Sequence, residues 1–312
     1  MKLLLTILLS TIYSLGFSQM QNDFEELVAR TNRYLQSYES LNGFASQENY
    51  FAWKDTHLPT ALVESMRKDQ DYQDELSPSR DSISEYGLIL ELQALIFQTL
   101  GQVLAHPVSQ GKDFTALFSE GDLAVIRSDD GKLYNFSLDE KTGGTYRSRI
   151  SLMHFIDFDA QQRPSAKAIE NGASNPYAIF EGDGFDRIYA IESKEGIKYL
   201  LEGSVRGCST CFESNIMLVS RKMDGFEQDF AYAVSSRGWE SSISYDHETK
   251  TISIDYLTDD LTSSCYCSED GTEEDYSEES DLSPVKNCTC TFEFDGFSFE
   301  LVQAGWKKVK ME

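Results

Sequence analysis

The chain has 312 residues, which is long enough for one large domain or two modest ones with real cores. Asp and Glu outnumber Lys and Arg by 52 to 27, which gives a formal net charge of −25. Such an acidic chain is repelled by nucleic acid and by anionic membrane surfaces, so the composition excludes both as expected partners and leaves cations and basic proteins open.

The first 18 residues have the form of a secretory signal peptide. Lys2 precedes the apolar run from Leu3 to Leu9, and a small-residue exit from Gly16 to Ser18 precedes Gln19. The run is shorter than the roughly 20 apolar residues of a spanning helix, and no later run reaches that length. We therefore expect no membrane span and a signal peptide cleaved near Ser18/Gln19, which leaves a soluble secreted or periplasmic protein.

The region that follows has helical periodicity. Apolar residues recur at helical spacing from Asn22 to Leu41, which predicts an amphipathic helix that packs on the body of the protein. A second helix is expected from Leu58 to about Asp69, with Pro59 in its first turn. Pro78 then marks a break in the pattern.

A third helix is expected from Tyr86 to Leu104. The preceding Ser82-Ile83-Ser84-Glu85 has the form of a capping box, in which Ser82 would cap the helix. The apolar residues cover more than one face, which predicts a buried helix. Glu91 and Gln93 interrupt the run, so a membrane-spanning role is not expected.

From about Gly121 the apolar period changes to two, which is typical of strands. The turn Asp129-Asp130-Gly131 connects two of them. The expected strands are Leu123–Ile126, Leu133–Phe136, Tyr146–Phe158, Tyr177–Phe180, Arg187–Ile191, Ile197–Val205, Asn215–Lys222, Phe230–Val234, Ser242–Tyr245, Thr251–Tyr256, Thr289–Phe294 and Phe297–Val302.

Closely spaced strands without intervening helices predict a mainly antiparallel β-region, built as a sandwich, an open barrel or propeller-like sheets. The expected fold class is therefore α+β. Its parts are the signal peptide 1–18, a helical region 19–110 and the antiparallel β-region 111–312, which contains a cysteine-rich acidic loop at 265–290.

One stretch resembles a known group of proteins. Residues 128–139, Ser-Asp-Asp-Gly-Lys-Leu-Tyr-Asn-Phe-Ser-Leu-Asp, are followed by Thr142-Gly143-Gly144-Thr145. This order of turn, aromatic strand and second turn after a helical leader resembles uncharacterised secreted β-rich proteins of Gram-negative bacteria. The resemblance implies a β-rich fold and an exported location, and it transfers no catalytic residue because no function is known for that family.

All six cysteines lie in the last third of the chain, as Cys208 and Cys211, Cys265 and Cys267, and Cys288 and Cys290. In a strand, both sulfurs of a C-x-C segment point to one face. If the two C-x-C segments pair antiparallel, one register joins Cys265 to Cys290 and Cys267 to Cys288, and Cys208 and Cys211 close a local bridge. A redox dithiol and a structural zinc site are the alternatives, but an exported protein favours disulfides.

The loop between the C-x-C segments is dense in carboxylates, and no Lys or Arg occurs between Lys250 and Lys286. The simplest interpretation is a solvated acidic loop tied at its base by disulfides. Oxygen ligands at this density also suggest weakly bound Ca²⁺, although the spacing is not that of an EF-hand. The candidate ligands are Glu269, Asp270, Glu273, Glu274 and Asp275.

No catalytic motif stands out. The chain has four histidines without metal-ligand spacing, and it lacks the G-x-S-x-G elbow, the Walker loop and the G-x-G-x-x-G fingerprint. We therefore expect an exported, non-enzymatic binding or structural protein of the bacterial envelope or secretome, which takes a protein, peptide or glycan partner. A secreted hydrolase using carboxylates and a divalent-cation-binding protein are the alternatives. Trp239, after Arg237-Gly238, is the candidate ligand-binding aromatic residue.

Overall fold

The structure is a computed structural model in which helices and antiparallel sheets form two compact units. Unit 1 comprises Met1–Val125, Tyr134–Gly144 and Leu152–Ala178, and unit 2 comprises Ile126–Leu133, Thr145–Ser151 and Ile179–Glu312. The structure describes residues 2–42, 49–68, 81–118, 123–141, 146–156, 179–180, 184–207, 211–222, 225–237, 241–258, 265 and 285–309.

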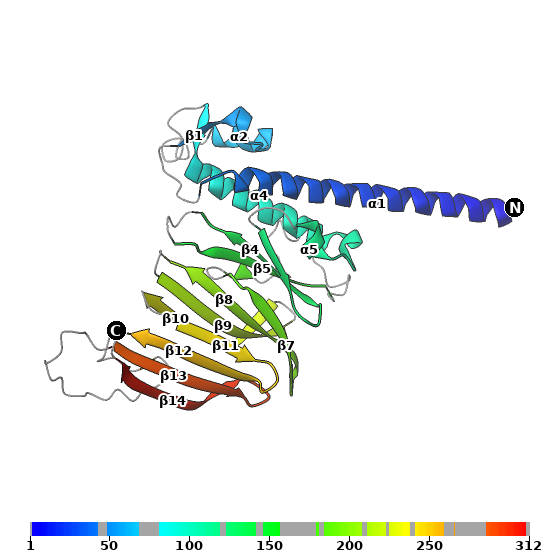
Figure 1. The fold of residues 1–312 in the computed structure, drawn as a ribbon. Coiled ribbons are helices and arrows are strands. Elements are labelled where there is room, and N and C mark those ends of the chain that lie inside the picture. The colour runs from blue at the N-terminus through cyan, green and yellow to red at the C-terminus, as the bar shows by residue number, and fades with distance from the viewer. Residues whose placement is uncertain are drawn as a thin grey trace. The chain divides into compact units, whose positions relative to one another are not determined.

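The helices lie in unit 1. They are α1 (Lys2–Glu39), α2 (Thr60–Met66), α4 (Glu85–Ala105) and α5 (Phe114–Leu117), with the 3₁₀ turns η1 (Trp53–Asp55) and η2 (Pro107–Ser109). Two short strands, β1 (Tyr50–Ala52) and β2 (Ser82–Ser84), pair antiparallel beside them. α1 and α4 lie side by side in Figure 1, and their facing side chains supply much of the core of this unit.

α1 confirms the helix expected from Asn22. Its buried positions Phe24, Leu35 and Tyr38 follow the expected helical spacing. The helix is continuous from Lys2 to Glu39, so it includes the segment interpreted as a signal peptide. Cleavage of that segment stays a prediction. The second expected helix is also confirmed, with Pro59 as the N-cap residue of α2 rather than in its first turn.

α4 is the buried helix expected from the apolar run, but its cap differs from the prediction. The N-cap is Ser84, whose Oγ accepts a hydrogen bond from the Gly87 N–H at 3.0 Å. Ser82 pairs with Ala52 in the β1–β2 ladder, so it lies in a strand, three residues before the helix begins at Glu85. The buried Glu85 carboxylate instead accepts from the Asn42 N–H at 2.7 Å and the Asn49 amide at 2.8 Å.

α4 is also long and apolar enough to cross a membrane, and among the helices of the described chain it alone passes that test of length and composition. Of its most apolar stretch, 56% is buried within the protein, as expected of a helix at the centre of a core. Burial raises the pKa of the Glu91 carboxyl group on this helix. The absence of a membrane span stays a prediction.

The strands follow the predicted meander. They are β3 (Leu123–Arg127), β4 (Leu133–Asp139), β5 (Arg149–Phe155), β6 (Ile179–Phe180), β7 (Arg187–Ser193), β8 (Gly196–Arg206), β9 (Cys211–Lys222), β10 (Gly225–Arg237), β11 (Ser241–Asp246), β12 (Thr251–Thr258), β13 (Val285–Phe294) and β14 (Phe299–Val309). They form three four-stranded sheets in sequence order, β3–β6, β7–β10 and β11–β14. No sheet closes on itself within the described chain, and the α+β class with a mainly antiparallel β-region is confirmed.

Unit 2 is organised around one core that the sheets β7–β10 and β11–β14 share. Alternate residues of both sheets point into it, among them Leu200 and Leu218 from the first and Ile254 from the second. Aromatic rings join the two layers, since Phe230 of β10 lies 5.2 Å from Phe292 of β13 between ring centroids. The strands of these two sheets are labelled in Figure 1.

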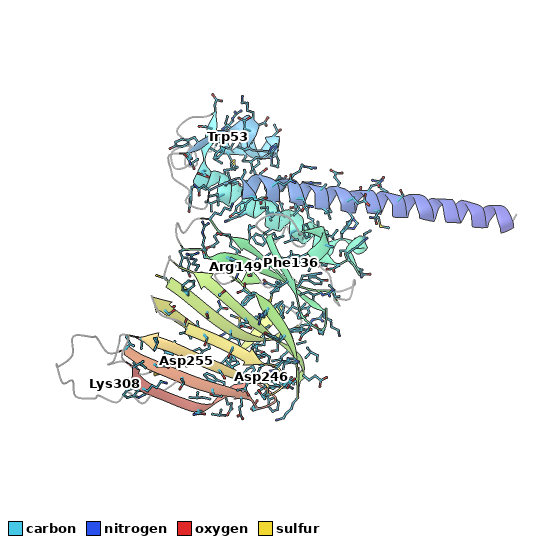
Figure 2. All side chains as sticks on the ribbon, in the orientation of Figure 1. Trp53, Phe136, Arg149, Asp246, Asp255 and Lys308 are labelled. Carbon is cyan, nitrogen blue, oxygen red and sulfur yellow. A yellow bond between two sulfur atoms is a disulfide. The ribbon has the colours of Figure 1, made fainter. Side chains whose placement is uncertain are left out.

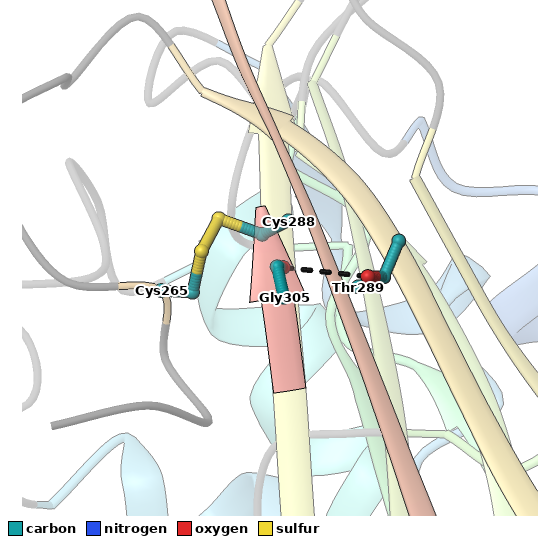
Figure 3. Close-up of a disulfide and its surroundings, with 4 residues drawn as sticks. All are labelled: Cys265, Cys288, Thr289 and Gly305. Atoms are coloured by element: carbon teal, nitrogen blue, oxygen red, sulfur yellow. Dashed lines mark hydrogen bonds between the residues drawn. A yellow bond between two sulfur atoms is a disulfide. The ribbon is translucent and has the colours of Figure 1, made fainter. Parts of the chain in front are cut away.

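The disulfide register differs from the prediction. Cys265 bonds to Cys288, not to Cys290, with their Cα atoms 5.7 Å apart (Figure 3). β13 already has a strand on each side, because Cys288 lies opposite Tyr256 of β12 and Trp306 of β14. Cys265 itself lies outside any strand, so the C-x-C segments cannot form the expected two-rung ladder.

Two parts of the cysteine prediction hold. Cys288 and Cys290 are both buried on one face of β13, as the period of two requires. Cys211 and Cys290 each belong to a disulfide as well, and no cysteine of the described chain is free. Cys208 and Cys267 lie outside the described residues.

Candidate functional site

The ligand candidates expected from sequence fall outside the described residues. This applies to Trp239 and to the acidic positions Glu269, Asp270, Glu273, Glu274 and Asp275. Within the described chain, no three His, Cys, Asp or Glu side chains are grouped so that they could hold a metal ion. The candidate site therefore comes from cavities that sequence reasoning did not find.

One cavity lies in unit 1, beside the C-terminal half of α1, and we call it the α1 pocket. Its volume is about 410 Å³, within the range typical of small-molecule sites. Leu41, Phe51 and Leu88 contribute apolar surface. The remaining lining residues are polar: Arg33, Gln36, Ser37, Ser40, Asp55, Thr56 and His57.

The α1 side of this pocket has a simple local cause. Gln36 and Ser37 lie three and four residues after Arg33 on one face of α1, and Ser40 follows directly after the end of the helix, three residues beyond Ser37. The serine hydroxyls are used within the helix, since Ser37 Oγ donates to the Arg33 carbonyl at 3.0 Å and Ser40 Oγ to the Ser37 carbonyl at 2.7 Å. The longer side chains of Arg33 and Gln36 are left to reach ligands.

The opposite side is formed by the turn after η1. Trp53 is buried at its start (Figure 2), and Thr56 Oγ1 donates to the Trp53 carbonyl at 2.8 Å. The next residue, His57, has φ of 57°, in the left-handed region that few non-glycine residues adopt. Because such strain is concentrated at ligand sites, an exposed His57 at the rim of a cavity marks this turn as a candidate binding loop.

The rim side chains are available for a ligand. In the described structure, Arg33, Gln36, Asp55 and His57 form no side-chain hydrogen bond or ion pair with another residue. Arg33 is exposed and carries five N–H donors in a planar fork. The pocket thus combines apolar surface with an unpaired guanidinium, which suits a molecule that has an apolar body and an anionic group.

A smaller cavity of about 220 Å³ lies in unit 2 and is lined mainly by residues of β7–β9; we call it the β8 pocket. Its charged groups are bonded to one another or to their neighbours. Asp186 accepts from Arg149 Nη2 and from Ser204 Oγ, both at 2.8 Å, and Glu202 accepts from the Tyr189 hydroxyl at 3.1 Å. The lining residues are Asp186, Arg187, Glu202, Gly203, Ser204, Ser214 and Ile243.

The electrostatics of the β8 pocket follow from those bonds. Partial burial raises the pKa of the Tyr189 phenol, which keeps it protonated as a donor to Glu202. A hydrogen bond with Tyr189, together with the charge of Glu202, raises the pKa of the Arg187 guanidinium. The polar groups of this cluster are therefore hydrogen-bonded to one another. Such a network stabilises the arrangement of the strands and leaves few groups to bind a ligand.

The other histidines have structural surroundings, as expected for isolated histidines. His154 is buried against the Phe114 ring, and His106 Nδ1 accepts from the Val108 N–H at 3.2 Å. Burial lowers the pKa of His106, and the charge of Asp23 only partly opposes that shift. His247 is exposed beside the Tyr189 ring. Of the four histidines, His57 alone lines a cavity described above.

Sequence reasoning missed the α1 pocket because its residues carry no motif. Arg33 and Asp55 are more than twenty positions apart and belong to different elements, and an exposed Arg on a helix usually only faces solvent. Comparison with known proteins adds no guide to the site: no family model, curated protein or solved structure matches this chain.

Proposed function

We propose that this chain is an exported binding protein that holds a small organic anion in the α1 pocket. The observation that carries the proposal is the unpaired Arg33 guanidinium at the rim of a cavity whose surface includes Leu41, Phe51 and Leu88. Arg is suited to this role because its fork of donors matches the two oxygens of a carboxylate or sulfonate.

The charges of the protein indicate how many anionic groups the ligand carries. With a formal net charge of −25, the protein repels anions at long range, so binding one requires a local cation such as Arg33. Asp55 on the same rim disfavours a second negative charge near it. We therefore propose a ligand with one anionic group and an aromatic or alkyl body that contacts the apolar lining.

Export is supported by the covalent structure. Disulfides such as Cys265–Cys288 persist in oxidising compartments and are rare in the cytosol. The apolar N-terminal run supports the same location, because it has the length of a signal peptide core. Secreted and periplasmic locations fit these features equally well.

The proposal can be tested with 8-anilinonaphthalene-1-sulfonate, a fluorescent aromatic sulfonate. We expect saturable binding with one dye per chain, weakened about tenfold or more by Arg33→Ala, which corresponds to losing one hydrogen-bonded charge. Arg30→Ala is the matched control on the same helix, because Arg30 pairs with Glu26 and does not line the pocket. Equal dye affinity in wild type and Arg33→Ala would contradict the proposed site.

A carboxylate-based hydrolase is a second candidate, because Asp186 and Glu202 line one cavity. The bonds that Asp186 makes to Arg149 and Ser204 engage both of its oxygens, which makes this candidate the weaker one. Hydrolysis of a chromogenic glycoside by the wild type, abolished in Glu202→Gln, would favour a hydrolase over simple binding.

The proposed Ca²⁺ affinity of the acidic loop is tested separately, by calorimetric titration with CaCl₂.

A further inference from the structure

β14 is an edge strand of the sheet β11–β14. Ten of its eleven residues pair with β13 on one side, and no strand of the described chain pairs with the other side. An unpaired edge of this length presents a row of backbone N–H and C=O groups that can pair with a strand from another chain.

The side chains of this edge are unusual for a surface. Leu301 is 43% exposed and Val302 is 52% exposed, although both are large and apolar. Val302 is an extra residue in the ladder, because Leu301 lies opposite Phe292 and Gln303 lies opposite the adjacent Thr291. Beyond this bulge, residues of β14 resume their alternation between the two faces of the sheet.

The register assigns each side chain to a face. Cys290 and Cys288 point into the core, so Ala304 and Trp306, which lie opposite them, share that inner face. Leu301 shares it too, opposite Phe292. The outer-face residues of β14 are Glu300, Gln303, Gly305, Lys307 and Val309, which lie opposite Glu293, Thr291, Thr289, Asn287 and Val285. Thr289 Oγ1 donates to the Gly305 carbonyl across this face (Figure 3).

These faces permit several two-fold symmetric pairings of β14 with a second copy of itself, and one of them has its axis beside Ala304. When the axis passes beside Ala304 and each bulged Val302 is skipped, Gln303 of one copy lies opposite Gly305 of the other. Next along the strand, Leu301 meets Trp306 on the inner face, and Glu300 meets Lys307 on the outer face. Every pair in this register joins residues of the same face, as an antiparallel ladder requires.

The charges favour this register. Within one chain Glu300 lies directly opposite Glu293, and like charges in that position destabilise a sheet. Lys307 of a second copy would flank Glu300 on its open side, and symmetry repeats the contact at the other end of the pair. Glu300 and Lys307 are both exposed, and neither forms an ion pair or a side-chain hydrogen bond with a described residue.

We propose that two copies of this chain associate through β14, so that their four-stranded sheets become one continuous eight-stranded antiparallel sheet with two-fold symmetry. The exposed Leu301 and the partly buried Trp306 supply apolar contact across the axis, and two Glu300–Lys307 pairs set the register. The surface is independent of the α1 pocket, so the proposal does not rest on the proposed ligand.

Sedimentation equilibrium of the exported protein from 1 to 100 μM in 0.15 M NaCl tests the pairing. The wild type is expected to reach the mass of a dimer. Glu300→Lys and Lys307→Glu each turn two attractive contacts into repulsive ones, so each is expected to weaken dimerisation about tenfold or more. The double variant Glu300→Lys/Lys307→Glu exchanges the charges and is expected to restore the wild-type dissociation constant.

The matched controls are Glu64→Lys on α2 and Lys54→Glu in η1, which make the same charge changes at exposed positions of unit 1 and should leave dimerisation unchanged. A wild type that stays monomeric to 100 μM would overturn the proposal. The charges of Glu300 and Lys307 would then act to prevent other chains from pairing with this edge strand. Single variants that dimerise like the wild type, or a double variant that is not restored, would overturn the proposed register.

Discussion

The side chain of Lys141 binds the carbonyl groups at the C-terminal end of α1. It is only 6% exposed, and its Nζ donates to the carbonyl oxygens of Tyr38 at 2.8 Å, Leu41 at 2.9 Å and Glu39 at 3.3 Å. These carbonyls lie at the C-terminal end of α1, where unsatisfied acceptors and the helix dipole favour a cation. The Tyr38 ring lies 4.8 Å from the same Nζ.

Replacing this lysine should therefore cost more than an ordinary surface change. We expect Lys141→Met to lower the free energy of unfolding by about 2 kcal/mol, because it leaves buried carbonyls without a donor. Urea denaturation followed by circular dichroism measures the change, and Lys54→Met at an exposed position is the control. A midpoint equal to that of the control would show that water satisfies these carbonyls.

Asp295 carries a pH-dependent contribution to stability in the turn between β13 and β14. Its Oδ1 accepts from the Phe297 N–H at 2.7 Å and the Ser298 N–H at 2.9 Å, and these bonds hold the pKa of the carboxyl group below its usual range. Since the folded pKa is the lower one, the ionised group stabilises the fold above about pH 4, and that contribution is lost as the pH falls through the folded pKa.

The corresponding variant is Asp295→Ala. We expect its melting temperature to lie below that of the wild type at pH 7, and the gap to narrow as the pH is lowered past about 4. Calorimetric melting from pH 7 to pH 3 gives both values. A gap that is constant over this range would show that the turn does not depend on the ionised carboxylate.

At the level of elements, the sequence predicted the helices and strands that have a clear hydrophobic period. The strands of unit 2 alternate as expected because one face of each sheet meets the shared core. The three-residue strands β1 and β2 were not predicted, since three residues cannot show a period. The C-x-C register failed for a different reason: sequence cannot show that β13 is flanked on both sides by other strands.

The observed cap of α4 leads to a prediction that separates the two serines. Ser84→Ala removes the acceptor for the Gly87 N–H and should lower the free energy of unfolding by about 1 kcal/mol. Ser82→Ala, at the residue first expected to be the cap, should change it by less than about half of that, because Ser82 lies in β2. Equal effects of the two substitutions in urea denaturation would contradict this assignment of the cap.

The disulfide Cys265–Cys288 ties a segment outside the sheets to the middle of β13. It closes a loop across a sequence separation of 23 residues, and a crosslink of that span is worth about 3 kcal/mol in the chain-entropy model. We expect the double variant Cys265→Ala/Cys288→Ala to lose about that much stability in urea denaturation. Unchanged stability in that variant would show that the bridge adds little to the fold.

At the level of the whole molecule, fold class was predictable and the candidate site was not. The change from helical to strand periodicity near Gly121 can be read from the hydrophobic pattern. The boundary between the two structural units cannot, because the units divide β3, β4 and β5 between them. The α1 pocket depends on packing between α1 and the turn at His57, and its key cation, Arg33, looks like any solvent-facing residue of an amphipathic helix.

The continuous α1 raises the question of which part of this helix the fold needs. The first position of α1 known to be buried is Phe24, which is 2% exposed and packs on His106 with their ring centroids 5.4 Å apart. Cleavage near Ser18/Gln19 would therefore remove residues that precede the first described core contact of the helix, and leave that contact intact.

Two shortened chains test this division of α1. A chain that begins at Gln19 should have the mass of the exported protein and a cooperative unfolding transition. A chain that begins at Arg30 should be less stable than the Gln19 chain by about 2 kcal/mol or more, because it lacks Phe24, and burying such a side chain is worth about that much. Equal stability would show that α1 is held from Thr31 onward, and an exported protein that retains Met1 would refute the signal peptide.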